Sequence, residues 1–102
     1  MHLVQIFLPL YDRHGHAFPR ERFDALRTGL TELFGGVTAF VRSPALGAWE
    51  DEGGRVQRDE VVLFEVMVSQ LDHGWWAAYR QQLERDFDQD EVLVRAMGVE
   101  KL

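Results

Sequence analysis

Cysteine is absent from this sequence of 102 residues. Its absence excludes a disulfide-stabilised scaffold, a thiolate zinc site and a cysteine nucleophile. Long apolar runs are also missing: the run near the start spans only about nine residues, too few to cross a bilayer. No basic region precedes that run, so it does not match a signal peptide. We therefore expect a soluble, cytoplasmic protein with no membrane partner.

An excess of positive charge is missing as well. The chain has 11 Lys and Arg against 17 Asp and Glu, a formal net charge of −6 at pH 7. Domains that bind nucleic-acid backbones without sequence preference usually have a positive net charge. We therefore expect no nucleic-acid partner.

The familiar phosphate-binding and serine-nucleophile motifs do not occur in the sequence. The glycine pairs 35–36 and 53–54 are too short, and too poor in hydroxyls or lysine, to cradle a phosphate. Asp12, His14 and His16 lie close together in one polar segment, but they offer no third nitrogen ligand for a divalent ion. The sequence therefore predicts no cofactor and no metal, and solvated side chains are favoured in that segment.

The composition is that of an ordinary folded domain. Apolar residues make up 46% of the chain and charged residues 27%, so wholesale disorder is excluded. A chain of this length has room for one core, and we expect a single domain over residues 1–102.

Hydrophobic periodicity predicts six elements of secondary structure. Short apolar or β-branched runs predict strands over residues 3–10, 37–42, 60–69 and 92–99. Helical spacing predicts a helix over residues 19–34 and a second that follows Asp72 and carries Trp76, Tyr79, Leu83 and Phe87 on one stripe. We expect residues 43–58 to form an irregular hairpin arm with its tip at Gly53-Gly54.

Specific residues predict where the helices begin and end. Pro19 suits a first helical turn, because its missing N–H has no partner there. Gly35 suits the left-handed position that ends a helix, and the Asp72 carboxylate suits an N-cap. Trp76 is predicted to lie in the core, whereas Trp75 is predicted to pack on the arm, on another subunit or on a ligand.

The order of elements is β-α-β-β-α-β. The economical packing is a four-stranded antiparallel sheet, in strand order 4-1-3-2, with both helices on one face. We therefore predict an α+β protein with a ferredoxin-like fold.

Alternation along the strands predicts two different faces of this sheet. One face is wholly apolar and is expected under the helices: Val4, Ile6, Leu8, Val62, Phe64, Val66, Val68, Val92, Val94 and Ala96. The other face is mixed: Leu3, Gln5, Phe7, Leu63, Glu65, Met67, Leu93, Arg95 and Met97. Each of its three strands has one polar residue near the middle, and the strand order would align Arg95, Gln5 and Glu65 across the sheet.

The mixed face is too apolar to stand open to water. The simplest cover is a second copy of the same sheet, so we expect a homodimer. Two interpretations of the polar residues stay open. In the first, Glu65 and Arg95 pair, Gln5 bridges them, and the network only sets the register of the interface. In the second, a pocket beside a desolvated Glu65 binds a small molecule.

The pocket interpretation assigns specific roles. Glu65 is the candidate base, Arg95 the anchor for a carboxylate, and Gln5 the orienting donor. Four further residues are candidate ligand contacts: Phe7, Met67, Met97 and Trp49.

Several short motifs resemble those of small bacterial proteins of uncharacterised function with a ferredoxin-like fold. The resemblance covers most of residues 4–94 and rests on Leu33-Phe34-Gly35-Gly36-Val37-Thr38, Gly47-x-Trp49, Gly54, Arg58-Asp59-Glu60, Tyr79-Arg80 and Phe87-x-Gln89-x-Glu91-Val92-Leu93. More loosely, the architecture is similar to the dimeric α/β-barrel group, which includes cofactor-free monooxygenases and muconolactone-type isomerases. The resemblance implies no catalytic residue at any particular position, because a fold does not determine a function.

Three functions therefore stay open. The chain is a dimer of uncharacterised function whose mixed face is an assembly surface, an enzyme acting on a small hydrophobic or aromatic acid, or a module that senses a small ligand without turnover.

Overall fold

The computed structural model describes residues 1–42 and 60–102, with side chains described outside 39–42. The elements are β1 (His2–Pro9), α1 (Arg20–Phe34), β2 (Val37–Arg42), β3 (Val61–Val68), α2 (His73–Asp86) and β4 (Leu93–Gly98). The predicted elements are confirmed, with ends that differ by a single residue at most. The arm at residues 43–58, including Trp49, lies outside the described residues.

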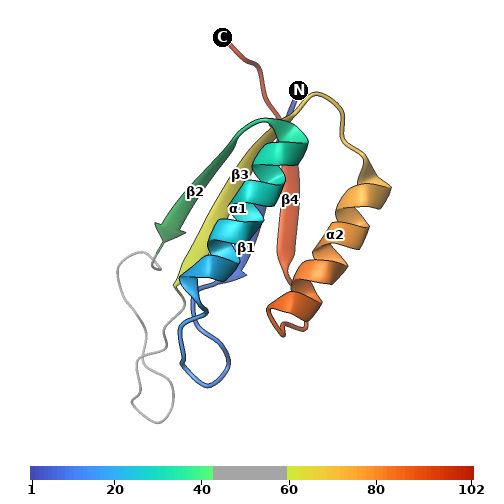
Figure 1. Ribbon diagram of the computed structural model, residues 1–102. Helices are drawn as coiled ribbons and strands as arrows, with labels where there is room; N and C mark the ends of the chain where they lie inside the picture. Colours follow the sequence, from blue (N-terminus) through green and yellow to red (C-terminus); the bar gives the residue numbers. More distant parts are fainter. Residues whose placement is uncertain (43–59) are drawn as a thin grey trace, which may run out of the picture.

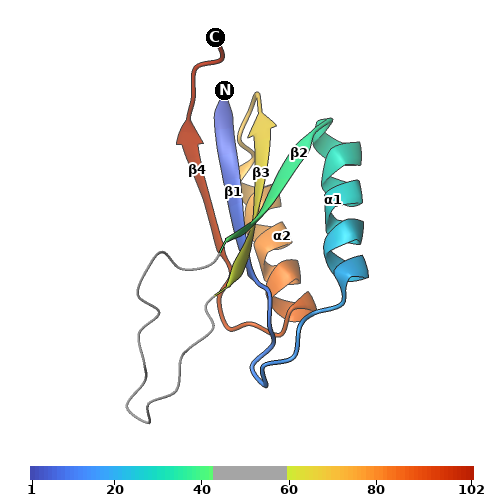
Figure 2. The ribbon, with the colours of Figure 1, turned by 90° about the vertical axis from the view of Figure 1, so that its left-hand side faces the viewer.

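The four strands form one antiparallel sheet in the order β2-β3-β1-β4. This is the predicted order read from the opposite edge, so the α+β, ferredoxin-like arrangement is confirmed. Both helices lie on the same face of the sheet (Figures 1 and 2). The chain ends lie together at one end of the sheet, where the Val99 N–H donates to the Met1 carbonyl at 3.0 Å.

The core lies between the helices and the sheet, because the strands turn their apolar side chains toward α1 and α2. Its buried residues are Val4, Ile6, Leu8, Leu30, Val62, Phe64, Val66, Val68, Trp76, Leu83, Phe87 and Val92. The Phe64 ring on β3 stacks on Phe23 of α1 at 6.5 Å between ring centroids. Burying side chains of this size contributes about 1.5–3 kcal/mol each, so this layer supplies most of the hydrophobic stabilisation.

The helix ends follow the predicted local chemistry. Gly35 adopts φ 85°, the left-handed conformation, and its N–H donates to the Thr31 carbonyl at 2.7 Å. The Asp72 carboxylate accepts the Trp75 N–H at 3.0 Å and so caps α2. Both predictions are confirmed.

The two tryptophans of α2 pack within the helical layer. Trp76 is buried in the core, as predicted. Trp75 packs against the rings of Phe34, Trp76 and Tyr79, with centroid distances of 4.8–5.3 Å. Among the described residues Trp75 therefore has a structural role between the helices.

Two residues of the sheet faces differ from the prediction in their exposure. Ala96 lies on the helix side of the sheet, as predicted, where it lines a groove with Trp76 and Ala77, but it is exposed because β4 is an edge strand. Leu63 was expected on an exposed patch but is only 1% exposed. It lies on an inner strand, directly opposite Phe7.

Candidate functional site

One polar side chain stands at the same level on each of three neighbouring strands, on the face away from the helices. Gln5 of β1 is directly opposite Glu65 of β3. It is also directly opposite Arg95 of β4. The predicted alignment of these residues across the sheet is confirmed, and we call them the polar row.

The polar row is joined by hydrogen bonds that use both ends of the Gln5 amide. Arg95 Nε donates to Gln5 Oε1 at 2.8 Å, and Gln5 Nε2 donates to Glu65 Oε2 at 2.8 Å. Because guanidinium nitrogens only donate and an ionised carboxylate only accepts, these bonds fix the amide in one orientation. Gln5 is 9% exposed, whereas Arg95 is exposed and Glu65 half-buried.

Glu65 and Arg95 are joined through Gln5 and not directly. β1 lies between their strands, so their backbones stand two strand spacings apart, about 9–10 Å. Gln5 fills that interval and links the two charged groups, as predicted for a bridging residue. The opposite charges are therefore kept apart, at the two ends of one row.

Arg95 has a second support besides Gln5. Its guanidinium carbon lies 5.0 Å from the centroid of the Phe7 ring, within cation–π range. The Nε bond and the ring together orient the guanidinium while its terminal nitrogens have no partner among the described residues. Such a group is suited to bind a planar anion.

Apolar side chains surround the polar row. Two residues before Gln5 on β1, Leu3 pairs with Met67 of β3 on one side and with Met97 of β4 on the other. Met67 and Met97 are each 42% exposed. Leu93, opposite Phe7, is 49% exposed. The structure thus brings three of the predicted ligand contacts, Phe7, Met67 and Met97, beside the polar row, whereas Trp49 lies outside the described residues.

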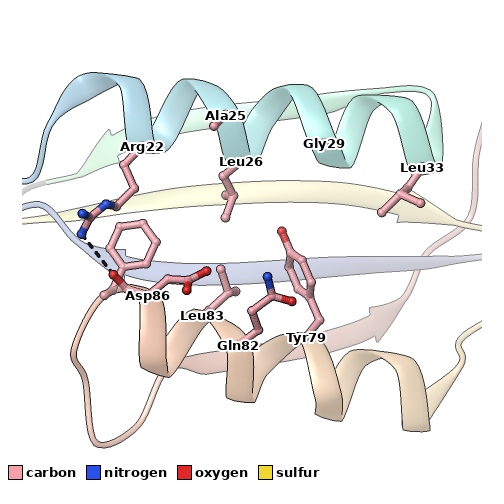
Figure 3. Close-up of a pocket in the computed structure, with 10 residues that line it drawn as sticks. Arg22, Ala25, Leu26, Gly29, Leu33, Tyr79, Gln82, Leu83 and Asp86 are labelled. Atoms are coloured by element: carbon pink, nitrogen blue, oxygen red, sulfur yellow. Dashed lines mark hydrogen bonds between the residues drawn. The ribbon is translucent and has the colours of Figure 1, made fainter.

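A separate cleft that the sequence did not predict runs between the two helices (Figure 3). It has a volume of about 450 Å³. Ala25, Leu26 and Gly29 of α1 face Tyr79 and Gln82 of α2 across it. The small residues four apart on α1 are a signal that sequence inspection could have used, because they leave space beside a helix.

The phenol of Tyr79 is perturbed by this cleft. Burial, together with the Asp86 carboxylate, raises the pKa of Tyr79 to about 12. At the Asp86 end of the cleft, Arg22 donates to the Asp86 carbonyl at 3.0 Å and lies over the Phe18 and Phe87 rings. Glu65 does not line this cleft.

The loop with Asp12, His14 and His16 is organised by backbone hydrogen bonds. Asp12 Oδ1 accepts the His14 and His16 N–H groups at 2.8 and 2.9 Å. The His16 bond is the main cause that lowers the pKa of Asp12. Within the described part of the chain no group of three or more His, Cys, Asp or Glu side chains is placed to hold a metal ion.

The fold and the polar row define a small α+β protein with a ferredoxin-like sheet. No family model matches the sequence. No curated protein matches it either. Across residues 1–42 and 60–102, no helix is both long and apolar enough to cross a membrane.

Two similar solved structures support the fold. One is a phage SAM lyase in complex with S-methyl-5′-thioadenosine, with a TM-score of 0.59 and 17% identity, covering 94% of this chain and 79% of that chain. The other is a phage SAM lyase in the apo state, with a TM-score of 0.55 and 17% identity, covering 94% of this chain and 78% of that chain. At this identity the likeness concerns the fold alone.

Proposed function

We propose that the open face of the sheet binds a small organic acid and that a second copy of the chain covers it. The observation that carries this proposal is the hydrogen-bonded polar row set among exposed apolar side chains. Here the neighbours are methionine, leucine and phenylalanine, which favour contact with a ligand or a partner.

Each residue of the polar row has a distinct role in this proposal. The oriented guanidinium of Arg95 binds the carboxylate of the ligand through its terminal nitrogens. Gln5 holds both charged groups in place. Glu65 uses Oε2 for Gln5, so its Oε1 is the atom that accepts a proton or a hydrogen bond from the ligand.

The second copy supplies the enclosure that a single chain lacks. Met67, Leu93 and Met97 are exposed apolar side chains on one face of the sheet, which supports a partner that covers them. A two-fold axis places the same patch against itself, so one surface satisfies both partners. The covered polar row then lies in a less polar medium, where its charges interact more strongly with a ligand.

Thermal-shift measurements test the binding proposal. We expect phenylacetate, and other acids of a small panel, to raise the melting temperature, whereas 2-phenylethanol does not, because the alcohol lacks the carboxylate. Arg95→Gln should remove the shift by the acid. Arg85→Gln is the matched control, since Arg85 is an exposed arginine on α2, on the other side of the sheet. Equal shifts by acid and alcohol would contradict the proposal.

A second candidate function is cleavage of S-adenosylmethionine. The observation that favours it is the likeness of the fold to the phage SAM lyase over 94% of this chain. S-adenosylmethionine has a carboxylate for Arg95 and a positively charged sulfonium for Glu65, so its charges match the two ends of the polar row. Chromatography after incubation with S-adenosylmethionine should reveal S-methyl-5′-thioadenosine with the wild type and not with Glu65→Gln. Its absence with the wild type rejects this candidate and leaves the first untouched.

A further inference from the structure

The cleft between the two helices exists because α1 and α2 do not pack directly against each other. No Cα atom of α1 lies within 8 Å of a Cα atom of α2. Helices in direct contact have axes about 8–10 Å apart, which brings some of their Cα atoms closer than that. The space left between them, about 450 Å³, is large enough for a small organic molecule.

The wall of the cleft on α1 is apolar and has open space beside it. Leu26, Gly29 and Leu33 line this wall at spacings of three and four residues, which places them on one flank of the helix. Leu33 is 60% exposed. A Cβ atom added at Gly29 would meet no atom within 4 Å in the described part of the chain. Packing against these residues therefore does not require a glycine, although glycine is less favourable inside a helix than alanine.

The wall of the cleft on α2 presents hydrogen-bond acceptors. Tyr79, Gln82 and Asp86 follow one another at spacings of three and four residues, and their side chains point into the cleft (Figure 3). A phenol oxygen, an amide oxygen and a carboxylate can each accept a hydrogen bond. Within residues 1–42 and 60–102, the side chains of Gln82 and Asp86 have no hydrogen-bond or ion-pair partner. These acceptors are therefore available to a ligand.

The electrostatic environment on this wall is negative. The Asp86 carboxylate helps to raise the pKa of Tyr79, which is the effect of an anion near a phenol. Arg22 also lines the cleft, but its guanidinium donates to the backbone carbonyl of Asp86 and lies over two phenylalanine rings. The Asp86 carboxylate points away from that bond, toward Gln82 (Figure 3). The acceptor wall therefore favours a positively charged group over a negative one.

We propose that the cleft between α1 and α2 binds a primary organic amine with an apolar body, in its ammonium form. The three N–H groups of the ammonium match the acceptors of Tyr79, Gln82 and Asp86. The apolar body lies along the other wall, in the space beside Gly29 and Leu33. This site goes beyond the proposed acid site and does not depend on it, because the helices and the polar row lie on opposite faces of the sheet (Figure 2).

Nuclear magnetic resonance titrations of the full chain at pH 7 test this proposal with three probes: 2-phenylethylammonium, 2-phenylethanol and ethylammonium. We expect 2-phenylethylammonium to bind at least about tenfold more tightly than either of the others, because the alcohol lacks the charge and ethylammonium lacks the ring. The backbone amide shifts should concentrate in the parts of α1 and α2 that line the cleft, residues 25–33 and 79–86.

Two variants assign the binding to the two walls of the cleft. Asp86→Asn should weaken binding of 2-phenylethylammonium at least about tenfold, because it removes the charge and keeps the size of the side chain. Asp90→Asn is the matched control and should change binding less than about twofold, since Asp90 is an exposed acid outside the cleft. Gly29→Leu should abolish binding, because its side chain fills the open space. Circular dichroism confirms that each variant is folded before binding is measured.

Three results would overturn the proposal. The first is equal binding of 2-phenylethylammonium and 2-phenylethanol, and the second is an equal effect of Asp86→Asn and Asp90→Asn. The third is a set of amide shifts confined to the strands, which would place the ammonium on the sheet. None of these measurements depends on the acid site, because the variants leave Gln5, Glu65 and Arg95 unchanged. The two proposals can therefore fail separately.

Discussion

The two faces of the same sheet are built by the same alternation, yet only one of them is complete. On β3, Phe64 and Val66 point to the helices and are at most 1% exposed. The alternate residues of β3 point to the other face, where Glu65 is half-buried and Met67 is 42% exposed. The comparison teaches that apolar content alone does not produce burial, because the second face has apolar side chains but no covering layer among residues 1–42 and 60–102.

The largest expected effect concerns the covered face. Phe64→Ala should destabilise the fold by about 3–5 kcal/mol, because it removes a ring that stacks on Phe23 and leaves a cavity. Met67→Ala, on the same strand, should cost less than about 1 kcal/mol in the dissociated chain, since that side chain is largely exposed. Urea unfolding of dilute samples measures both. Similar losses for the two variants would break the contrast between the faces.

A smaller effect is expected for the cap of α2, which positions the helical layer. Asp72→Ala should destabilise the fold by about 1 kcal/mol, because the Trp75 N–H loses its acceptor. Asp72→Asn is the matched control, since asparagine is a good N-cap and should retain most of the stability. An unchanged midpoint for Asp72→Ala in urea unfolding would show that the cap does not contribute.

On the open face, Gln5→Leu should cost about 1 kcal/mol in stability, because water replaces the bonds that Arg95 and Glu65 lose. It should also abolish the thermal shift by phenylacetate, since both charged groups lose their support. Gln5→Glu keeps the size of the side chain but lacks the N–H that donates to Glu65, so this variant should also fail to bind phenylacetate. A Gln5→Leu variant with an unchanged phenylacetate shift would assign the polar row a structural role only.

The last expected effect appears only at alkaline pH and concerns Tyr79 in the helical layer. Burial raises the pKa of Tyr79 to about 12 from its ordinary 10.0, so the fold favours the neutral phenol. The stability that this group contributes is therefore complete below pH 10 and is lost as the pH rises toward 12. Absorbance titration of tyrosinate should show a step near pH 12 that Tyr79→Phe removes. A Tyr79 step at pH 10 would contradict the described burial.

The fold could be predicted from local signals because they agree with one another. Glycine at the end of α1, the Asp72 cap and the period-two pattern of β3 each fix an element, and only one simple topology connects them. The alignment of Gln5 with Glu65 and Arg95 followed from that topology.

Other features depended on distances between elements, which alternation does not encode. The cleft beside Tyr79, the exposure of Ala96 and the burial of Leu63 all depend on how far a helix or a strand stands from its neighbour. The separation of Glu65 from Arg95 depends in the same way on the strand between them.

Sedimentation at micromolar concentration tests most directly whether a second copy covers the open face. The account predicts a species of twice the 11.8 kDa chain mass, and a shift toward the single chain when Met67→Glu places a charge on the patch. Glu32→Gln, an exposed change on α1, should leave the mass unchanged. A wild-type species at 11.8 kDa, equal to that of Met67→Glu, would contradict the covered face and the enclosed acid site together.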